Sequence, residues 1–136
     1  MNWPSPEKLE RAQTLLRWVC ALNFIGVGIL HFTHPAVFEL MMPALLPAHR
    51  ELVWVSGFFE ILGGLGLLVP ATRRFAAWGL LALLLAVFPA NINMAVNEIY
   101  LPTDWLPQSK AGLWIRLPLQ AVIALEVWFV GLWRPS

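Results

Sequence analysis

Residues 75–97 read FAAWGLLALLLAVFPANINMAVN, and this stretch contains no charged side chain. An α-helix needs about 20 consecutive, mostly apolar residues to cross the hydrocarbon core of a bilayer. The stretch reaches that length, although Pro89 lies inside it. We therefore predict that it spans a membrane as a helix.

Three other segments of the chain have the same length and character. The predicted spans are residues 12–33, 52–69, 75–97 and 113–133. The first ends at residue 33 because the residue before Pro35 disfavours helical dihedral angles, and the second ends at Pro70. Short connections imply antiparallel neighbours, and Gly57 and Gly64 would let a neighbouring backbone come close. The prediction is an all-α fold, a polytopic four-helix up-down transmembrane bundle formed by a single domain, residues 1–136.

Composition supports a membrane protein. The 136 residues are 59% hydrophobic and 12% charged, whereas a soluble domain is about 25% charged. The lipid bilayer is therefore an expected partner, and a net charge of +1 gives no reason to expect nucleic acid. Cys20 is the single cysteine, which excludes an intramolecular disulfide and a cysteine-rich metal cluster, and we predict no metal site.

The orientation prediction comes from basic residues, which favour the cytoplasmic side. One side of the predicted bundle is flanked by Lys8, Arg11, Arg17, Arg73, Arg74 and Arg134. The other side is flanked by Arg50, Lys110 and Arg116. This asymmetry predicts that both termini are cytoplasmic, in a bacterial cytoplasmic membrane.

A second apolar stretch, residues 31–47 (HFTHPAVFELMMPALLP), follows the first span and is too short to cross a bilayer. Pro35 suits the first turn of a helix, and VFELMM can lie with its apolar face in the interface. We predict a short interfacial or re-entrant helix at about residues 35–42. Its Phe38, Met41 and Met42 would close a pocket from water, with His31 at the rim.

Polar side chains at membrane depth are costly unless they are paired or solvated, so they mark candidate functional residues. The spans carry Asn23, His31, Glu60, Asn91, Asn93, Asn97, Arg116, Gln120 and Glu126. Nearly all of these residues fall in the outer half of the predicted bundle. The segregation by depth predicts one polar pocket shared by the four helices and open toward the outer face.

The predicted ligand-binding residues are Asn23, His31, His34, Glu60, Asn91, Arg116 and Gln120. Helical phase places Asn23 and His34 on one arc, with His31 off to one side. Among the cations, Arg116 lies at the predicted membrane depth that best suits pairing with Glu60. That pair would either hold the helices of the bundle together or face a ligand. The amides of Asn91 and Gln120 would satisfy each other or bind a carbonyl ligand. No catalytic residue is assigned.

Four runs of the sequence resemble the DoxX-like membrane proteins: GILHFTHPAVFELMMPALLP, SGFFEILGGLGLLVPATRR, LLAVFPANINMAVN and WIRLPLQ. The resemblance extends from about Leu22 to Val127 and implies a four-helix membrane bundle. DoxX-like proteins include subunits associated with thiosulfate:quinone oxidoreduction and others with redox-linked or assembly roles. The matched positions are His31, Pro35, Pro43, Pro47, Gly57, Glu60, Gly64, Pro70, Arg73, Pro89, Asn91, Arg116, Pro118 and Gln120.

Three functional hypotheses follow. In the first, the chain binds a small amphipathic or quinone-like ligand as a subunit of a redox-linked membrane complex. The chain itself carries no intrinsic cofactor, the bound molecule is a quinone or a lipid, and a redox or assembly protein is the partner. In the second, it is a structural or assembly protein whose polar cluster only fixes helix packing. The third, a small-molecule transporter, is less attractive because four spans leave little room for alternating access without a homo-oligomer. Whether the chain is an enzyme stays open.

Overall fold

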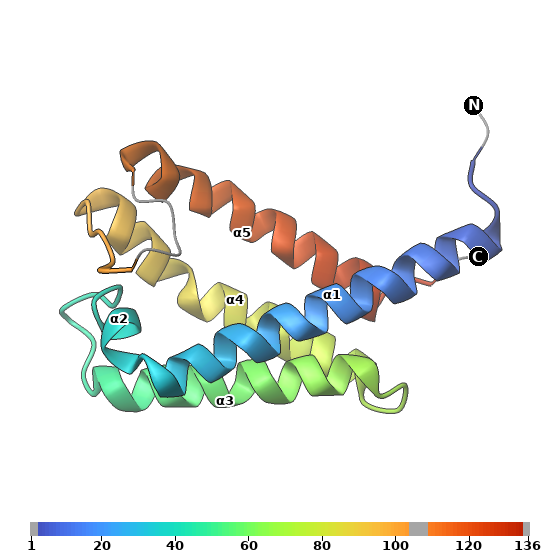
Figure 1. The fold of residues 1–136 in the computed structure, drawn as a ribbon, viewed down its shortest axis with the longest axis horizontal. Coiled ribbons are helices and arrows are strands. Elements are labelled where there is room, and N and C mark those ends of the chain that lie inside the picture. The colour runs from blue at the N-terminus through green and yellow to red at the C-terminus, as the bar shows by residue number, and fades with distance from the viewer. Residues whose placement is uncertain (1–2, 104–108, 135–136) are drawn as a thin grey trace.

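The computed structural model describes residues 3–103 and 109–134, and every regular element in these ranges is a helix. The elements are α1 (Pro6–Thr33), α2 (Pro35–Glu39), α3 (His49–Leu68), α4 (Arg73–Val96) and α5 (Lys110–Gly131). Figure 1 shows α1, α3, α4 and α5 as long, roughly antiparallel rods, with α2 at one end. The prediction of an all-α four-helix bundle is confirmed.

The surface of the long helices is apolar. All four are long and apolar enough to cross a membrane. Large side chains on their outer faces are exposed, among them Leu15 at 69%, Phe75 at 81% and Leu85 at 75%. A chain of this size cannot present such a surface to water, because exposed apolar patches of that extent mark lipid or protein contacts. The protein is therefore an integral membrane protein.

The helix ends differ modestly from those predicted. The first helix begins at Pro6 rather than near residue 12, because proline is well placed in a first turn and the following residues are good helix formers. The short helix α2 ends at Glu39 rather than residue 42. Beyond it the amides of Met41 and Met42 donate to the carbonyls of Phe38 and Glu39, both at 3.2 Å, so the chain continues as turns.

Glycines let α1 and α3 pack closely, as predicted for Gly57 and Gly64. A Cβ atom built on Gly57 would lie 2.8 Å from the Gly28 carbonyl oxygen, and one built on Gly28 would lie 2.7 Å from that of Gly57. A Cβ on Gly64 would lie 2.8 Å from the carbonyl oxygen of Ala21. These contacts with backbone atoms leave no room for a side chain. The two helices are therefore held in one register along their shared face.

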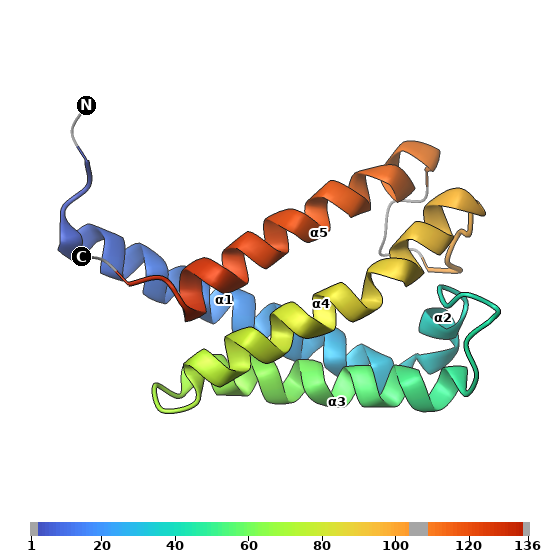
Figure 2. The ribbon, with the colours of Figure 1, turned by 180° about the vertical axis from the view of Figure 1, so that it is seen from behind.

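The two ends of the bundle are packed differently. At the end where α1 begins and α5 stops, which we call the termini end, a buried cluster from four helices includes Leu67, Ala77, Leu80, Val127 and Val130. Toward the opposite end, which we call the α2 end, α4 and α5 diverge from α1 and α3 (Figures 1 and 2). The α2 helix and its following loop lie between the separated pairs.

Candidate functional site

Where the helices diverge, at the α2 end, they leave a pocket of about 830 Å³ between them. This volume lies in the range typical of small-molecule sites, about 300–1,000 Å³. Its walls are mostly apolar and come from every helix, and among the predicted ligand-binding residues they contain Asn23, His31, Glu60, Asn91, Arg116 and Gln120. The prediction that polar groups of the four spans meet in one pocket is confirmed. Asn93, Asn97 and Glu126 lie outside its lining.

His34 does not line the pocket, so the prediction that groups it with Asn23 is wrong. It follows the last residue of α1 with φ −131° and ψ 53°, which is not a helical conformation. The helical phase therefore does not extend to it. Its Nδ1 instead lies 2.8 Å from the hydroxyl oxygen of Thr33, near the surface. His31, which the phase places to one side, is buried and faces α3.

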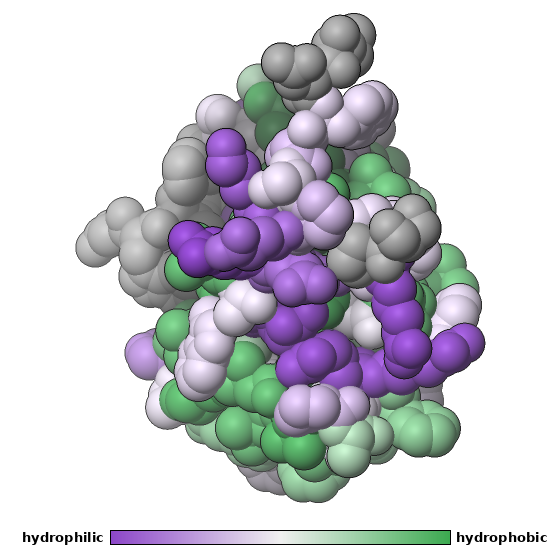
Figure 3. Space-filling view, turned by 90° about the vertical axis from the view of Figure 1, so that its right-hand side faces the viewer, coloured by the Kyte–Doolittle hydropathy of each residue, from purple (hydrophilic) through white to green (hydrophobic). Residues whose placement is uncertain are grey.

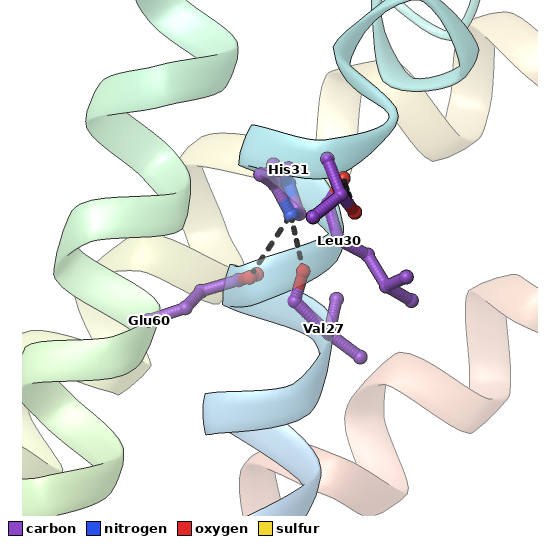
Figure 4. Close-up of polar contacts among 5 residues, drawn as sticks. Val27, Leu30, His31 and Glu60 are labelled. Carbon is purple, nitrogen blue, oxygen red and sulfur yellow. Dashed lines mark hydrogen bonds and ion pairs between the residues drawn. The ribbon is translucent and has the colours of Figure 1, made fainter.

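The carboxyl group of Glu60 lies against the ring of His31 (Figure 4). The distance from His31 Nδ1 to Glu60 Oε2 is 3.3 Å, and the two side chains are only 9% and 11% exposed. The same Nδ1 lies 2.7 Å from the carbonyl oxygen of Val27. A carbonyl can only accept, so Nδ1 carries a hydrogen and donates it to Val27. Glu60 Oε2 is consequently left without a hydrogen-bond partner in the buried site.

The predicted Glu60–Arg116 pair is therefore wrong, and the glycine contact explains why. His31 follows Gly28 by three residues on α1, and Glu60 follows Gly57 by three on α3. The close approach of the two glycines thus brings these side chains together. A Cβ atom on Gly57 would lie 2.6 Å from the Cβ of His31, so the missing side chain makes room for the ring. Arg116 is carried by α5, on the side of the pocket that diverges from α3 (Figure 1).

The short helix α2 and its turn cover the pocket, as predicted. Phe38, Met41 and Met42 all line it. The ring of Phe38 stacks on His31, with centroids 3.8 Å apart and planes inclined by 18°. Asn93 of α4 donates to the carbonyl oxygen of Met41 at 3.0 Å, which ties the turn to the opposite wall. The covering segment is therefore bonded to the bundle on both sides.

An ion pair joins α2 to α3 outside the pocket. The Arg50 guanidinium donates to both carboxylate oxygens of Glu39, at 2.8 and 3.3 Å. These hydrogen bonds hold the pKa of Glu39 below its usual value, because they stabilise the charged form. The pair is partly exposed, so its strength depends on pH and salt.

The opposite wall carries an amide pair. Asn91 Nδ2 of α4 donates to Gln120 Oε1 of α5 at 2.6 Å, and Gln120 Nε2 donates to the carbonyl oxygen of Leu84. That carbonyl belongs to the turn that precedes Pro89, where a proline weakens the helical hydrogen bonds. Of the two alternatives predicted for these amides, the structure shows the one in which Asn91 and Gln120 bond to each other. Both residues also border the pocket.

Arg116 is the remaining charged group of the pocket. It is half-buried, and its terminal Nη1 lies 3.7 Å from the sulfur of Met94. Within residues 3–103 and 109–134 no carboxylate oxygen lies within 4 Å of it. Among the described residues, the pocket therefore holds a guanidinium without a carboxylate partner and a carboxyl oxygen without a donor. Such groups are costly at membrane depth unless water or a ligand satisfies them.

A family model described as a domain of unknown function, DUF8561, matches residues 20–131. The match contains every residue that lines the pocket. Neither the curated proteins nor the solved structures include a match to the chain.

Proposed function

This chain belongs to the DUF8561 family, and we propose that it binds a small amphipathic molecule with carbonyl oxygens, such as a quinone. The observation that supports the proposal most directly is that one largely apolar cavity of about 830 Å³ contains Glu60 Oε2, which accepts no hydrogen bond, and Arg116, which has no carboxylate partner among the described residues. A ligand with an apolar body and polar atoms at its ends matches both features. The cavity walls would hold the body, and the polar side chains would orient it.

Each polar group has a role suited to such a ligand. Arg116 would donate to a carbonyl oxygen and stabilise negative charge that develops on it. Glu60, beside His31, would exchange a proton with a second oxygen. The chain would act as a binding subunit, with electrons supplied by a redox partner protein. The resemblance of its motifs to DoxX-like membrane proteins, some of which are associated with quinone chemistry, supports this assignment.

Access from the bilayer also favours a membrane-soluble ligand. Asn23 on α1 and Leu119 on α5 both line the pocket and are exposed. These two helices diverge toward the α2 end (Figure 1). A molecule dissolved in the lipid would enter between them without passing through water.

We further propose that the α2 end faces the outer side of a bacterial cytoplasmic membrane. The termini end carries Lys8, Arg11, Arg17, Arg73, Arg74 and Arg134, whereas the α2 end carries Arg50, Lys110 and Arg116. An excess of basic residues favours the cytoplasmic side. The pocket would then receive its ligand from the outer leaflet.

The second candidate is a structural or assembly protein. The bonds among Asn91, Gln120 and the Leu84 carbonyl favour it, because these groups satisfy one another across α4 and α5 without a ligand. Glu60 Oε2 argues against it, since a cluster that only fixes packing gains nothing from a buried oxygen without a donor. A transporter ranks third, because the termini end is closed by apolar packing.

The test measures equilibrium binding of a short-chain quinone to the full chain in detergent. Quenching of the protein's tryptophan fluorescence reports the binding. We expect saturable binding to the wild type and about tenfold or weaker binding to Arg116→Gln, since a hydrogen bond from a charged donor is lost. Lys110→Gln is the matched control: it removes the same charge from α5 outside the pocket and leaves affinity unchanged. Absence of saturable binding to the wild type would contradict the proposal.

A further inference from the structure

A second, smaller pocket of about 160 Å³ lies at the termini end, far from the first. Its lining comes from α1, the turn between α3 and α4, the start of α4, the end of α5 and the residues that follow it. Four of the lining residues are arginines: Arg17, Arg73, Arg74 and Arg134. Figure 3 looks onto this end and shows hydrophilic residues gathered across it, surrounded by apolar ones. We call this feature the arginine pocket.

Two of the arginines are held in place by backbone carbonyls. Arg17 Nε donates to Val130 and Arg73 Nε donates to Leu67, each at 2.9 Å. Both side chains are half-buried. Nearby, Gln13 Nε2 donates to the carbonyls of Phe129 and Trp133, at 2.7 and 2.9 Å, which anchors the end of α5. The two guanidinium groups are thus positioned by the fold, and their terminal nitrogens make no hydrogen bond to the residues that the structure describes.

The arginine pocket has no internal counter-charge in the part of the chain that the structure describes. Its lining contains no acidic residue, and no carboxylate lies within 4 Å of any of the four arginines in residues 3–103 and 109–134. On α1, Glu7 is occupied by Arg11 at 2.6 Å. Several guanidinium groups gathered without a carboxylate form a site for an anion, and their planar donor pairs match phosphate oxygens in particular.

The start of α4 adds to the positive charge of the arginine pocket. The helix begins at Arg73, and the hydroxyl of Thr72 donates to the Gly66 carbonyl at 3.0 Å instead of capping the helix. A helix N-terminus carries partial positive charge, which favours a nearby anion. The contribution is secondary to that of the arginine side chains.

The position of the arginine pocket indicates the source of the phosphate. It lies beside α1 where α3 and α5 end and α4 begins, which is the level expected for lipid headgroups. On α4, next to Arg74, the side chains of Phe75 and Trp78 are 81% and 57% exposed on the apolar surface. Trp133 lines the pocket itself. A lipid bound here would place its phosphate among the arginines and its acyl chains along these aromatic rings.

We propose that the arginine pocket binds the phosphate of an anionic lipid headgroup. Basic pockets between transmembrane helices recognise such headgroups, and each basic residue near the surface contributes about a fivefold gain in affinity. The bound lipid would link α1 to α5 and to the α3–α4 turn, which all contribute to the arginine pocket. This inference does not depend on what the larger pocket binds.

The test is native mass spectrometry of the full chain in neutral detergent, titrated with phosphatidylglycerol, phosphatidylcholine or inorganic phosphate. We expect one preferred phosphatidylglycerol, weaker retention of phosphatidylcholine, and no retention of inorganic phosphate. Arg74→Gln with Arg134→Gln should weaken phosphatidylglycerol binding about 30-fold. Both residues are exposed and make no hydrogen bond within the described residues, so the fold should survive; an unchanged thermal unfolding midpoint verifies this.

Lys8→Gln with Arg11→Gln is the matched control. It removes the same charge from the same end of the molecule, but neither residue lines the arginine pocket. Its phosphatidylglycerol affinity should stay within about twofold of the wild type. Equal weakening by both double variants would overturn the proposal, because a diffuse charge effect would then explain the binding. Binding of inorganic phosphate as tightly as the lipid would overturn it as well.

Discussion

Around Leu80, at the termini end, side chains from all four long helices fill the space between them, whereas toward α2 the same helices leave a pocket of about 830 Å³. The closed half contains apolar side chains that complete one another's packing. The open half contains Glu60, whose Oε2 accepts no hydrogen bond, and Arg116, which has no carboxylate partner among the described residues. The contrast supports the proposal that the closed half provides stability and the open half provides binding.

The substitution with the largest expected effect on the free energy of unfolding lies in the closed half. Leu80 is 1% exposed and belongs to the core cluster, so Leu80→Ala leaves a cavity. We expect a loss of about 3 kcal/mol in the free energy of unfolding. Leu85→Ala, on the same helix but 75% exposed, should change it by less than about 0.5 kcal/mol. Detergent-based equilibrium unfolding measures both, and equal effects would refute a core at the termini end.

The contact between α1 and α3 gives a second, smaller effect. A Cβ on Gly28 would meet the Gly57 carbonyl oxygen at 2.7 Å, while one on Gly26 would meet nothing within 4 Å. Gly28→Ala should therefore destabilise the protein by about 2 kcal/mol and displace Glu60 from His31. Gly26→Ala should be neutral or stabilising by about 0.5 kcal/mol, since alanine favours a helix. The same unfolding assay compares them, and a neutral Gly28→Ala would show that the close approach is not required.

The substitution Glu60→Gln should affect binding of the quinone probe without a comparable effect on the stability of the protein. Glu60 Oε2 accepts no hydrogen bond, so an amide of the same shape should change the free energy of unfolding by less than about 1 kcal/mol. Binding of the quinone probe should nevertheless fall, because the carboxyl group is lost. A destabilisation of about 3 kcal/mol or more would instead indicate a buried ion pair with His31 that holds the bundle together, as the assembly hypothesis requires.

The smallest expected effect is a change in the protection of the α2 segment when the ion pair between Glu39 and Arg50 is lost. The Arg50 hydrogen bonds lower the pKa of Glu39 in the folded protein below its value of about 4.5 in the unfolded chain. The resulting stabilisation is fully present above that value and is lost as the pH falls through the lower, folded pKa. Amide hydrogen exchange of residues 37–46, corrected for intrinsic rates, should therefore show lower protection at acidic pH. Glu39→Gln should show lower protection at neutral pH and no such step; an identical step in this variant would rule out Glu39 as its cause.

The sequence predicts the architecture well because membrane spans are governed by length and hydropathy. The four helices and the short α2 follow from patterns along single segments of the chain. The contact between Asn91 and Gln120 joins two helices, so the sequence offers it only as one of two alternatives. The partner of Glu60 is not predicted correctly, because it depends on how α1 packs on α3. Gly28 provides the missing signal: it precedes His31 by the same three residues that separate Gly57 from Glu60. His34 is misplaced because the helical phase of Asn23 does not apply to a residue beyond the end of α1, an end that Pro35 correctly predicts.

Photoaffinity labelling with a short-chain azidoquinone tests the central claim, that the open half of the bundle is a binding site. After illumination of the full chain in detergent, we expect labelled peptides from the turn that contains Met41 and Met42 and from the α5 wall around Leu119, with excess unlabelled quinone preventing the reaction. Labelling confined to lipid-facing residues such as Phe75 and Leu85, and insensitive to competitor, would contradict the account.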